Sequence, residues 1–147
     1  MKSIVYLQFA GNAKEALEFY KKALNADKVK FSTFAVMPNP AMSQKEKDMI
    51  MDAYIEFGDN IIMLSDVPPF MEQAMGKITV GSNMLISIIE GDRETNEKLF
   101  NGLSEGGTII MPISEAPWSK CFGMLVDKFG VTWKFNSDAR SFLDNIK

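Results

Sequence analysis

A lysine stands in the middle of a short segment whose residues alternate in character. In an extended strand, successive side chains point to opposite faces. Within VTWKFN (131–136), Trp133 and Phe135 therefore share an apolar face, while Lys134 lies on the opposite face. An ammonium group carries a positive charge and three hydrogen-bond donors, so Lys134 suits the binding of a carboxylate or phosphate. It is equally suited to pairing with a neighbouring acid, or to extending into solvent along apolar surface.

Histidine is absent from the sequence. This absence excludes Ser-His-Asp and Cys-His catalytic arrangements and the histidine-containing zinc sites, although a site made of carboxylates alone stays open. Glu56 and Asp66 suggest acid–base catalysis, but nothing in their spacing places them in one site, and we expect both to be solvated charges.

Cys121 is the single cysteine, which excludes an intrachain disulfide. We expect it to be an inert, partly buried thiol.

The composition is that of a globular protein without a nucleic-acid footprint. The chain has 147 residues, 46% apolar and 24% charged, with a net charge of −3. Binding to nucleic acid needs clustered Lys and Arg, so we expect no nucleic-acid partner. No apolar run approaches the roughly 20 residues that cross a bilayer, and no signal-peptide pattern precedes the first strand, so we expect no membrane partner and a cytoplasmic location.

The elements that must position these residues occur twice in the same order. Gly91-Asp92 stands 80 residues after Gly11-Asn12, and each pair separates a predicted strand from a predicted helix. This internal repeat predicts two βαβββ modules in an α+β fold. The first comprises a strand (4–9), a helix (13–25) and three strands (29–36, 49–57 and 61–66); the second comprises a strand (83–90), a helix (93–104) and three strands (108–113, 121–127 and 131–136).

Local signals mark where the helices begin. Asn12 with Glu15 has the spacing of a capping box before the first helix, and Ser43 with Glu46 has the same spacing before a short helix. We expect one domain, residues 1–147, divided into a first module (1–66), a linker (67–80), a second module (81–137) and a C-terminal helix (138–147). Each sheet has one face for its helix, and the twin module is the expected partner of the other face.

Two stretches resemble a known family. FAGNAKEALEFYKKAL (9–24) is similar to the opening strand and helix of PhnB-like proteins of the vicinal oxygen chelate superfamily, which includes the glyoxalase, bleomycin-resistance and dioxygenase folds. WSKCFGMLVDKFGVTWKFN (118–136) resembles their closing signature. The resemblance implies that the paired modules curve around a cleft. It also implies that metal-holding relatives take their ligands from the first and last strands of each module.

The resemblance places six residues of this chain at the cleft. Metal-binding relatives carry a carboxylate where this chain carries Lys134, and an ammonium has no lone pair and repels a divalent ion. Thioethers are poor ligands for such metals. We therefore expect neither a metal nor another cofactor, and we expect most strand methionines, including Met111 and Met124, to lie in the core. The expected ligand-contacting residues are Tyr6, Gln8, Met63, Met84, Trp118 and Lys134.

Three functions follow as alternatives. The first is a metal-free binding protein for a small, mostly apolar or anionic molecule. The second is an enzyme of lyase, isomerase or transferase type that uses cleft side chains such as Lys134 or Tyr6. The third is an interaction protein whose cleft is filled by its own side chains. A methyltransferase label carried by some relatives has no support in FAGNAKE (9–15), which departs from the glycine-rich nucleotide fingerprint. The resemblance also implies a homodimer.

Overall fold

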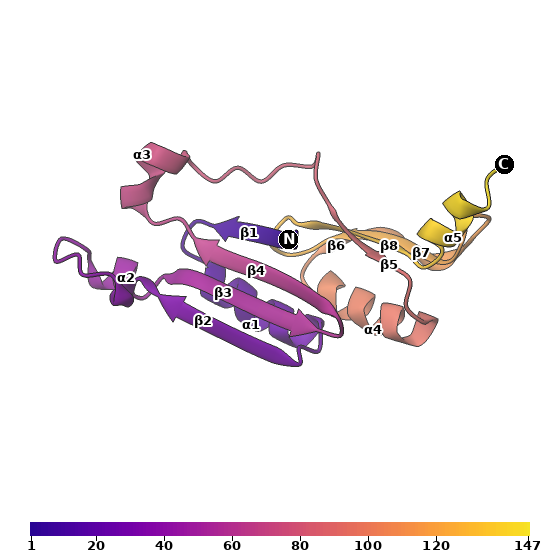
Figure 1. The fold of residues 1–147 in the computed structure, drawn as a ribbon, viewed down its shortest axis with the longest axis horizontal. Helices are drawn as coiled ribbons and strands as arrows, with labels where there is room; N and C mark the ends of the chain where they lie inside the picture. Colours follow the sequence, from indigo (N-terminus) through magenta and orange to yellow (C-terminus); the bar gives the residue numbers. More distant parts are fainter. The chain divides into compact units, whose positions relative to one another are not determined.

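The computed structural model describes residues 1–147, which form two compact units, Met1–Thr79 and Val80–Lys147. Each unit contains one four-stranded mixed sheet and one long helix, and each is described by itself (Figure 1). In both units the first strand of the module pairs in parallel with the last, and the other neighbours are antiparallel. The predicted α+β fold with two βαβββ repeats is therefore confirmed.

The first unit has the strand order β1-β4-β3-β2. Helix α1 packs against β3 and β4. Two 3₁₀ turns, η1 (Phe34–Val36) and η2 (Pro69–Met71), interrupt the connections. The remaining elements are β1 (Val5–Phe9), α1 (Ala13–Ala23), β2 (Lys28–Thr33), α2 (Gln44–Lys47), β3 (Ile50–Phe57), β4 (Asn60–Asp66) and α3 (Glu72–Met75).

The second unit repeats this arrangement with the strand order β5-β8-β7-β6. Helix α4 packs against β7 and β6. A short helix, α5, follows the last strand. The elements are β5 (Ile86–Ile89), α4 (Arg93–Ser104), β6 (Thr108–Ala116), β7 (Ser119–Val126), β8 (Thr132–Asn136) and α5 (Ala139–Asp144).

Each sheet buries the face that its long helix covers. Ala16, Leu17 and Tyr20 of α1 recur at helical spacing and are fully buried. In the second unit, Trp133 and Phe135 of β8 are fully buried, and the ring of Phe135 meets the ring of Phe100 of α4 edge to face at 5.5 Å. The prediction that Trp133 packs beneath a helix is confirmed. Alternation along β8 therefore directs Lys134 to the opposite side, which we call the open face of the sheet.

Two predicted strands are shorter in the structure because their partner strands end. The strand expected over 29–36 stops at Thr33, because β3 begins only at Ile50, and the chain continues as η1. The strand expected over 83–90 is limited to Ile86–Ile89, because its parallel partner β8 begins only at Thr132. Conversely, β6 extends to Ala116, since it pairs there with Ser119 at the start of β7.

The capping box predicted for α1 is wrong. The side chain of Asn12 makes no capping hydrogen bond. Instead, Oδ1 of Asp66, at the end of β4, accepts hydrogen bonds from the backbone N–H groups of Gly11 and Ala13, both at 2.9 Å. Its Oδ2 accepts a third bond from the N–H of Ile50, also at 2.9 Å. Asp66 is therefore a buried structural carboxylate, and the expectation that it is a solvated charge is wrong.

The short helix α2 begins with the capping box that its sequence predicts. Ser43 accepts from the N–H of Glu46, and Glu46 accepts from the N–H of Ser43. Helix α4 is capped locally by Asp92, whose Oδ1 accepts from the N–H of Thr95 at 2.9 Å. The two long helices thus use different caps. A carboxylate from the sheet caps the first, and the residue just before the helix caps the second.

Candidate functional site

Lys134 lies at the centre of a row of side chains on the open face of the second sheet. It pairs in register with Ser87 of β5 on one side and Met124 of β7 on the other. Met124 in turn pairs with Met111 of β6. Lys134 is half-buried. A cation therefore stands between a serine hydroxyl and two thioether side chains, and the next row of this face contains both apolar and polar side chains.

The charge of Lys134 has no counterion within the second unit. Lys134 takes part in none of the salt bridges of this unit, which include those of Arg93 with Glu97, Lys98 with Glu94, and Arg140 with Glu90. The alternative in which Lys134 pairs with a neighbouring acid therefore has no support there. Two residues along β8, the Oδ1 atom of Asn136 is buried without a hydrogen-bond partner. The open face of β8 thus carries a free donor and an unsatisfied acceptor side by side.

Tyr6 takes part in a polar cluster on the open face of the first sheet. Its hydroxyl donates to Oδ1 of Asp52 at 3.0 Å, although the two residues are 46 positions apart in the sequence. Burial raises the pKa of the Tyr6 hydroxyl, and the bond to Asp52 and the negative charge of Asp52 raise it further, while a hydrogen bond with Ser65 opposes them. The phenol is therefore protonated at neutral pH and acts as a donor.

Gln8 and Met63 extend this cluster along the sheet. Met63 pairs in register with Tyr6 on one side and with Tyr54 on the other. Gln8 pairs with Ser65. Gln8 is exposed and Met63 half-buried. The structure thus brings three predicted residues of the first unit together, and it adds Asp52 and Ser65. Sequence analysis missed these two because only the strand register places them beside Tyr6.

Met84 does not occupy the strand position predicted for it. It lies before β5 and is 81% exposed. The residue that stands opposite Lys134 on the neighbouring strand is Ser87. The expectation that most strand methionines lie in the core is also wrong. Met63 and Met124 are half-buried, and Met111 is exposed, because all three lie on open faces rather than beneath a helix.

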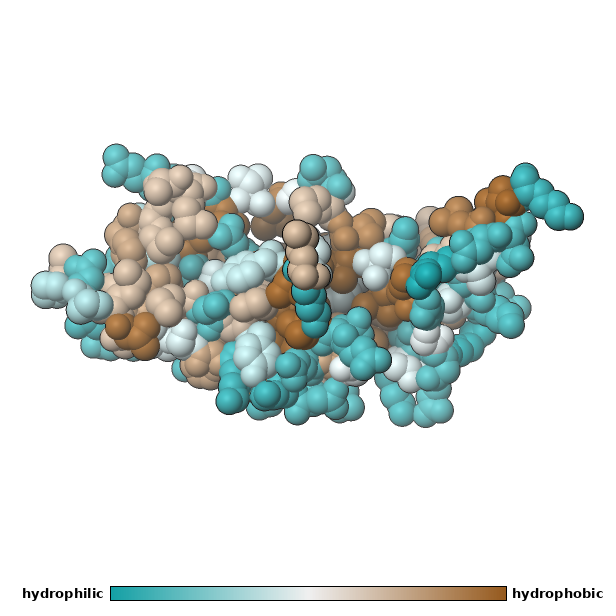
Figure 2. Space-filling model, in the orientation of Figure 1, coloured by the Kyte–Doolittle hydropathy of each residue, from teal (hydrophilic) through white to brown (hydrophobic).

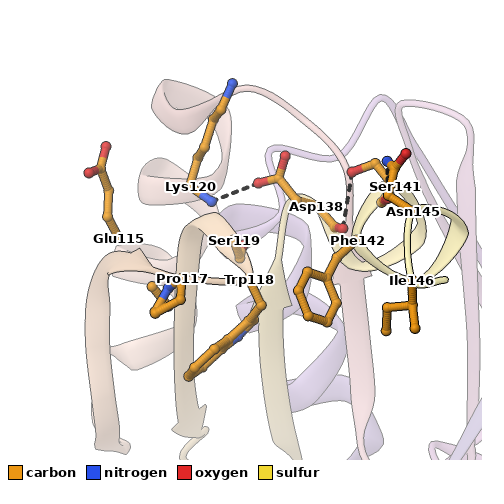
Figure 3. A pocket seen from close by; sticks show the side chains of 11 residues that line it. Glu115, Pro117, Trp118, Ser119, Lys120, Asp138, Ser141, Phe142, Asn145 and Ile146 are labelled. Atoms are coloured by element: carbon orange, nitrogen blue, oxygen red, sulfur yellow. Dashed lines mark hydrogen bonds between the residues drawn. The ribbon is translucent and has the colours of Figure 1, made fainter.

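A groove in the second unit lies between the β6–β7 turn and α5 (Figure 3). Its cavity volume is about 590 Å³, within the roughly 300–1,000 Å³ typical of small-molecule sites. Trp118, in the turn, is 42% exposed, and Phe142, on α5, is 46% exposed. The ring of Trp118 also meets the ring of Phe122 edge to face at 5.4 Å. In Figure 2, hydrophobic atoms lie at the surface of α5, at the upper right.

Trp118 is the one predicted site residue that lines this groove, although it was expected at the cleft between the modules, and the lining residues of α5 were not predicted. The segment 138–146 predicts a helix, yet no local pattern shows that the helix lies beside the β6–β7 turn. The turn and the helix are held together through Asp138, which accepts from the N–H of Lys120 at 2.7 Å and from the hydroxyl of Ser137 at 2.6 Å. These bonds, led by that from Ser137, lower the pKa of the Asp138 carboxyl.

The side chains at the positions expected for metal ligands do not fit a divalent metal. Lys134 offers no lone pair, and Met63 offers a soft thioether. Tyr6 and Gln8 add a protonated phenol and an amide. Within either unit, no group of three or more His, Cys, Asp or Glu side chains is placed to hold a metal ion. We therefore derive no chemical step through a metal.

A carboxylate already lies at the N-terminus of each long helix, where a ligand phosphate would otherwise bind. Asp66 occupies the N-terminus of α1, and Asp92 occupies that of α4. A phosphate at either end would meet a carboxylate that already uses these donors.

None of the helices has both the length and the apolar character needed to cross a bilayer.

Comparison with known proteins identifies relatives over nearly the whole chain. The family model described as 3-demethylubiquinone-9 3-methyltransferase matches residues 1–136. Protein YjdN of Escherichia coli (strain K12) is 30% identical over 140 residues, which cover 89% of this chain and 91% of that protein. The crystal structure of protein PA1353 from Pseudomonas aeruginosa is 30% identical, with a TM-score of 0.75, and the match covers 94% of this chain and 98% of that chain.

Two further structures connect the family name with the fold. A putative 3-demethylubiquinone-9 3-methyltransferase, PhnB protein, from Bacillus cereus is 26% identical, with a TM-score of 0.68, covering 93% of this chain and 99% of that one. A glyoxalase/bleomycin resistance protein/dioxygenase family enzyme from Burkholderia phytofirmans PsJN shares the fold at 16% identity and a TM-score of 0.58, covering 92% and 97% of the two chains. The chain therefore belongs to the PhnB-like family described as 3-demethylubiquinone-9 3-methyltransferase, and it has the glyoxalase/bleomycin resistance fold.

Proposed function

We propose that this protein binds a small, mostly apolar molecule that carries an anionic group, without the help of a metal. The observation that supports this most directly is Lys134, a half-buried cation without a counterion in its unit, flanked on the open face by Met124 and, one row along, by Phe122. A carboxylate or phosphate bound to Lys134 would satisfy this charge. The methionine side chains adapt to ligands of different shape.

Each sheet carries proposed ligand contacts of its own. In the second unit, Lys134 holds the anionic group, and Trp118 provides an aromatic surface at the end of the same sheet. In the first unit, Tyr6 and Gln8 are hydrogen-bonding groups for a ligand. Met63, on the neighbouring strand β4, offers an apolar contact beside them. Met84 is exposed before β5, and its contact with a ligand stays a prediction.

Binding of small acids tests this function. We expect some members of a panel of aromatic and aliphatic carboxylates and phosphate esters to raise the melting temperature. Lys134→Met removes the charge while keeping an unbranched side chain, and a charge-assisted hydrogen bond is worth about 1.5–3 kcal/mol, so affinity for the same acids should fall about tenfold or more. Lys134→Glu should abolish their binding through repulsion. Lys98→Met, on the exposed surface of α4, serves as the matched control.

Two results would contradict this proposal. If Lys134→Met binds the acids as tightly as the unaltered chain, Lys134 is not the anion anchor. If protein purified without chelator contains stoichiometric zinc, nickel, iron or manganese by elemental analysis, the metal-free mode is wrong. Neither result depends on knowing the natural ligand.

A second candidate function is catalysis by the Tyr6–Asp52 pair. The hydrogen bond between them holds a protonated phenol in a fixed orientation on the open face, as a general acid requires. In this role the Tyr6 hydroxyl would turn its single O–H from Asp52 to a substrate oxygen and donate the proton there, and the phenolate left behind would regain a proton from water. If a substrate is found among the small acids, Tyr6→Phe should lower its turnover while leaving binding at Lys134 intact.

We also propose a homodimer in the cytoplasm. Strands β2 and β6 are edge strands of their sheets, and open edges favour pairing between chains. The one cysteine is free, which suits a reducing compartment. Light scattering coupled to gel filtration tests the dimer, and a mass of a single chain over the working concentration range would exclude it.

A further inference from the structure

We propose that the groove between the β6–β7 turn and α5 is a second binding site, for a small molecule that joins an aromatic ring to a protonated amine. This inference is independent of the anion anchor at Lys134. It rests on the groove's apolar side, on its carboxylates, and on the way in which Asp138 is held.

The apolar side of the groove is built to take a flat group. In Figure 3, the rings of Trp118 and Phe142 project to the same side of the groove, and Ile146 lies beside them. These side chains come from two different elements, the turn and α5, and both line the groove. Burying an aromatic ring between two others gives both apolar contact and offset or edge-to-face stacking.

The polar side of the groove favours a cation over an anion. Three charged side chains line it, Glu115, Lys120 and Asp138, and two of them are acidic. In Figure 3, the Lys120 side chain extends away from Asp138, and only its backbone N–H points to that carboxylate. An aromatic anion would meet the negative charge of these carboxylates, whereas an ammonium would find an acceptor at Asp138.

Asp138 is prepared to accept a further hydrogen bond. Its Oδ2 accepts hydrogen bonds from the N–H of Lys120 and from the hydroxyl of Ser137. Neither of these two bonds uses Oδ1. The bonds from Ser137 and Lys120 lower the pKa of the Asp138 carboxyl, so the group is ionised at neutral pH. A ligand ammonium therefore meets a carboxylate whose orientation is already fixed, which reduces the entropy lost on binding.

The test compares two probes of the same shape and opposite charge. 2-Phenylethylamine and 3-phenylpropionate carry the same ring on a short chain, one ending in an ammonium and the other in a carboxylate. Both are titrated into the Lys134→Met variant, so that an acid held at Lys134 beside Trp118 does not contribute. Isothermal titration calorimetry should then show that the amine binds and that the acid does not. Tryptophan fluorescence gives a local signal, since Trp118 is 42% exposed and Trp133 is fully buried. Only the amine should change the Trp118 emission, and the Trp118→Phe variant should lose that change.

Variants then assign the contacts. Asp138→Asn keeps an acceptor for the N–H of Lys120 but removes the charge, so affinity for 2-phenylethylamine should fall about tenfold to a hundredfold. Phe142→Ala should weaken the binding of the amine about tenfold without touching the carboxylate. Asp144→Asn lies on the same helix outside the groove and serves as the control, with unchanged affinity. Glu115→Gln replaces Asp138→Asn if circular dichroism shows that the latter unfolds.

The outcomes separate this site from the anion anchor. Lys134→Met should leave the affinity for 2-phenylethylamine unchanged, even if it abolishes the binding of acids. The inference is wrong if the amine gives no heat of binding up to its solubility limit, if 3-phenylpropionate changes the Trp118 emission of the Lys134→Met variant with equal affinity, or if the folded carboxylate variant binds the amine as tightly as the unaltered chain does.

Discussion

The indole N–H of Trp133 donates a hydrogen bond to Oδ2 of Asp127 at 2.9 Å, in the core of the second unit. The other oxygen of Asp127 accepts from the backbone N–H groups of Phe129 and Val131, at 2.9 and 3.1 Å. One buried carboxylate thus fixes the turn before β8 and the first core side chain of that strand. The register of β8, and with it the direction of Lys134, depends on this turn.

Removing the Asp127 carboxylate should therefore destabilise the second unit. Asp127→Ala leaves three donors without their acceptor, and each unsatisfied buried donor costs about 1–3 kcal/mol, so we expect the free energy of unfolding to fall by about 3 kcal/mol or more. Urea denaturation followed by Trp fluorescence measures this. Asp59→Ala, in the exposed β3–β4 turn, is the control. A loss below about 1 kcal/mol would show that water replaces the carboxylate.

Asp66 should matter as much in the first unit. Two of its backbone donors, Gly11 and Ala13, lie at the start of α1, and the third, Ile50, is the first residue of β3. Asp66→Ala should lower the free energy of unfolding by about 3–5 kcal/mol. Hydrogen exchange gives a local readout, because the amides of Ala13 and Ile50 should lose protection first. Equal protection of these amides in the variant would contradict the capping role.

The phenol of Tyr6 should titrate above its ordinary pKa of 10.0 because of burial and Asp52. Ultraviolet absorbance of phenolate, compared between the unaltered chain and Tyr6→Phe, isolates this group. Asp52→Asn removes a nearby negative charge, so the pKa of Tyr6 should move down towards its ordinary value. An unchanged pKa in that variant would show that burial alone is responsible.

The same shift sets the sign of a stability effect at high pH. The folded chain keeps the Tyr6 proton to higher pH than the unfolded chain does, so the folded state binds more protons between the two pKa values. The contribution of Tyr6 is fully present below pH 10.0 and is lost as pH rises through the raised pKa. The free energy of unfolding of Tyr6→Phe should therefore fall less steeply above pH 10.0 than that of the unaltered chain. Identical pH profiles for the two proteins would contradict this contribution.

Cys121 should be unreactive in the folded protein. It is 1% exposed, and burial raises the pKa of its thiol, so little thiolate forms at neutral pH. Ellman's reagent should label it slowly in buffer and rapidly in denaturant, with one thiol per chain. Rapid labelling of the folded protein would show that β7 opens readily. The predicted burial of this thiol is confirmed, whereas its inertness stays a prediction.

The sequence alone determined the βαβββ repeat and the faces of its strands. Side chains alternate between the two faces of any strand. The sequence of residues 131–136 was therefore enough to predict that Lys134 lies on the face opposite to Trp133 and Phe135. Helical spacing in α1 likewise predicted which side chains it buries. These patterns are local because a strand repeats every two residues and a helix every 3.6.

Only the tertiary structure decided which distant side chains meet. Asp66 caps a helix 53 residues earlier, and Tyr6 bonds to Asp52 across 46 residues, because strand register sets these pairs. No local pattern distinguishes Asp66 from the solvated carboxylate expected of it. In the same way, Phe142 reaches the groove beside Trp118 because Asp138 ties α5 to the β6–β7 turn. Contacts of this kind depend on how distant segments of the chain pair and pack, and local periodicity does not determine that.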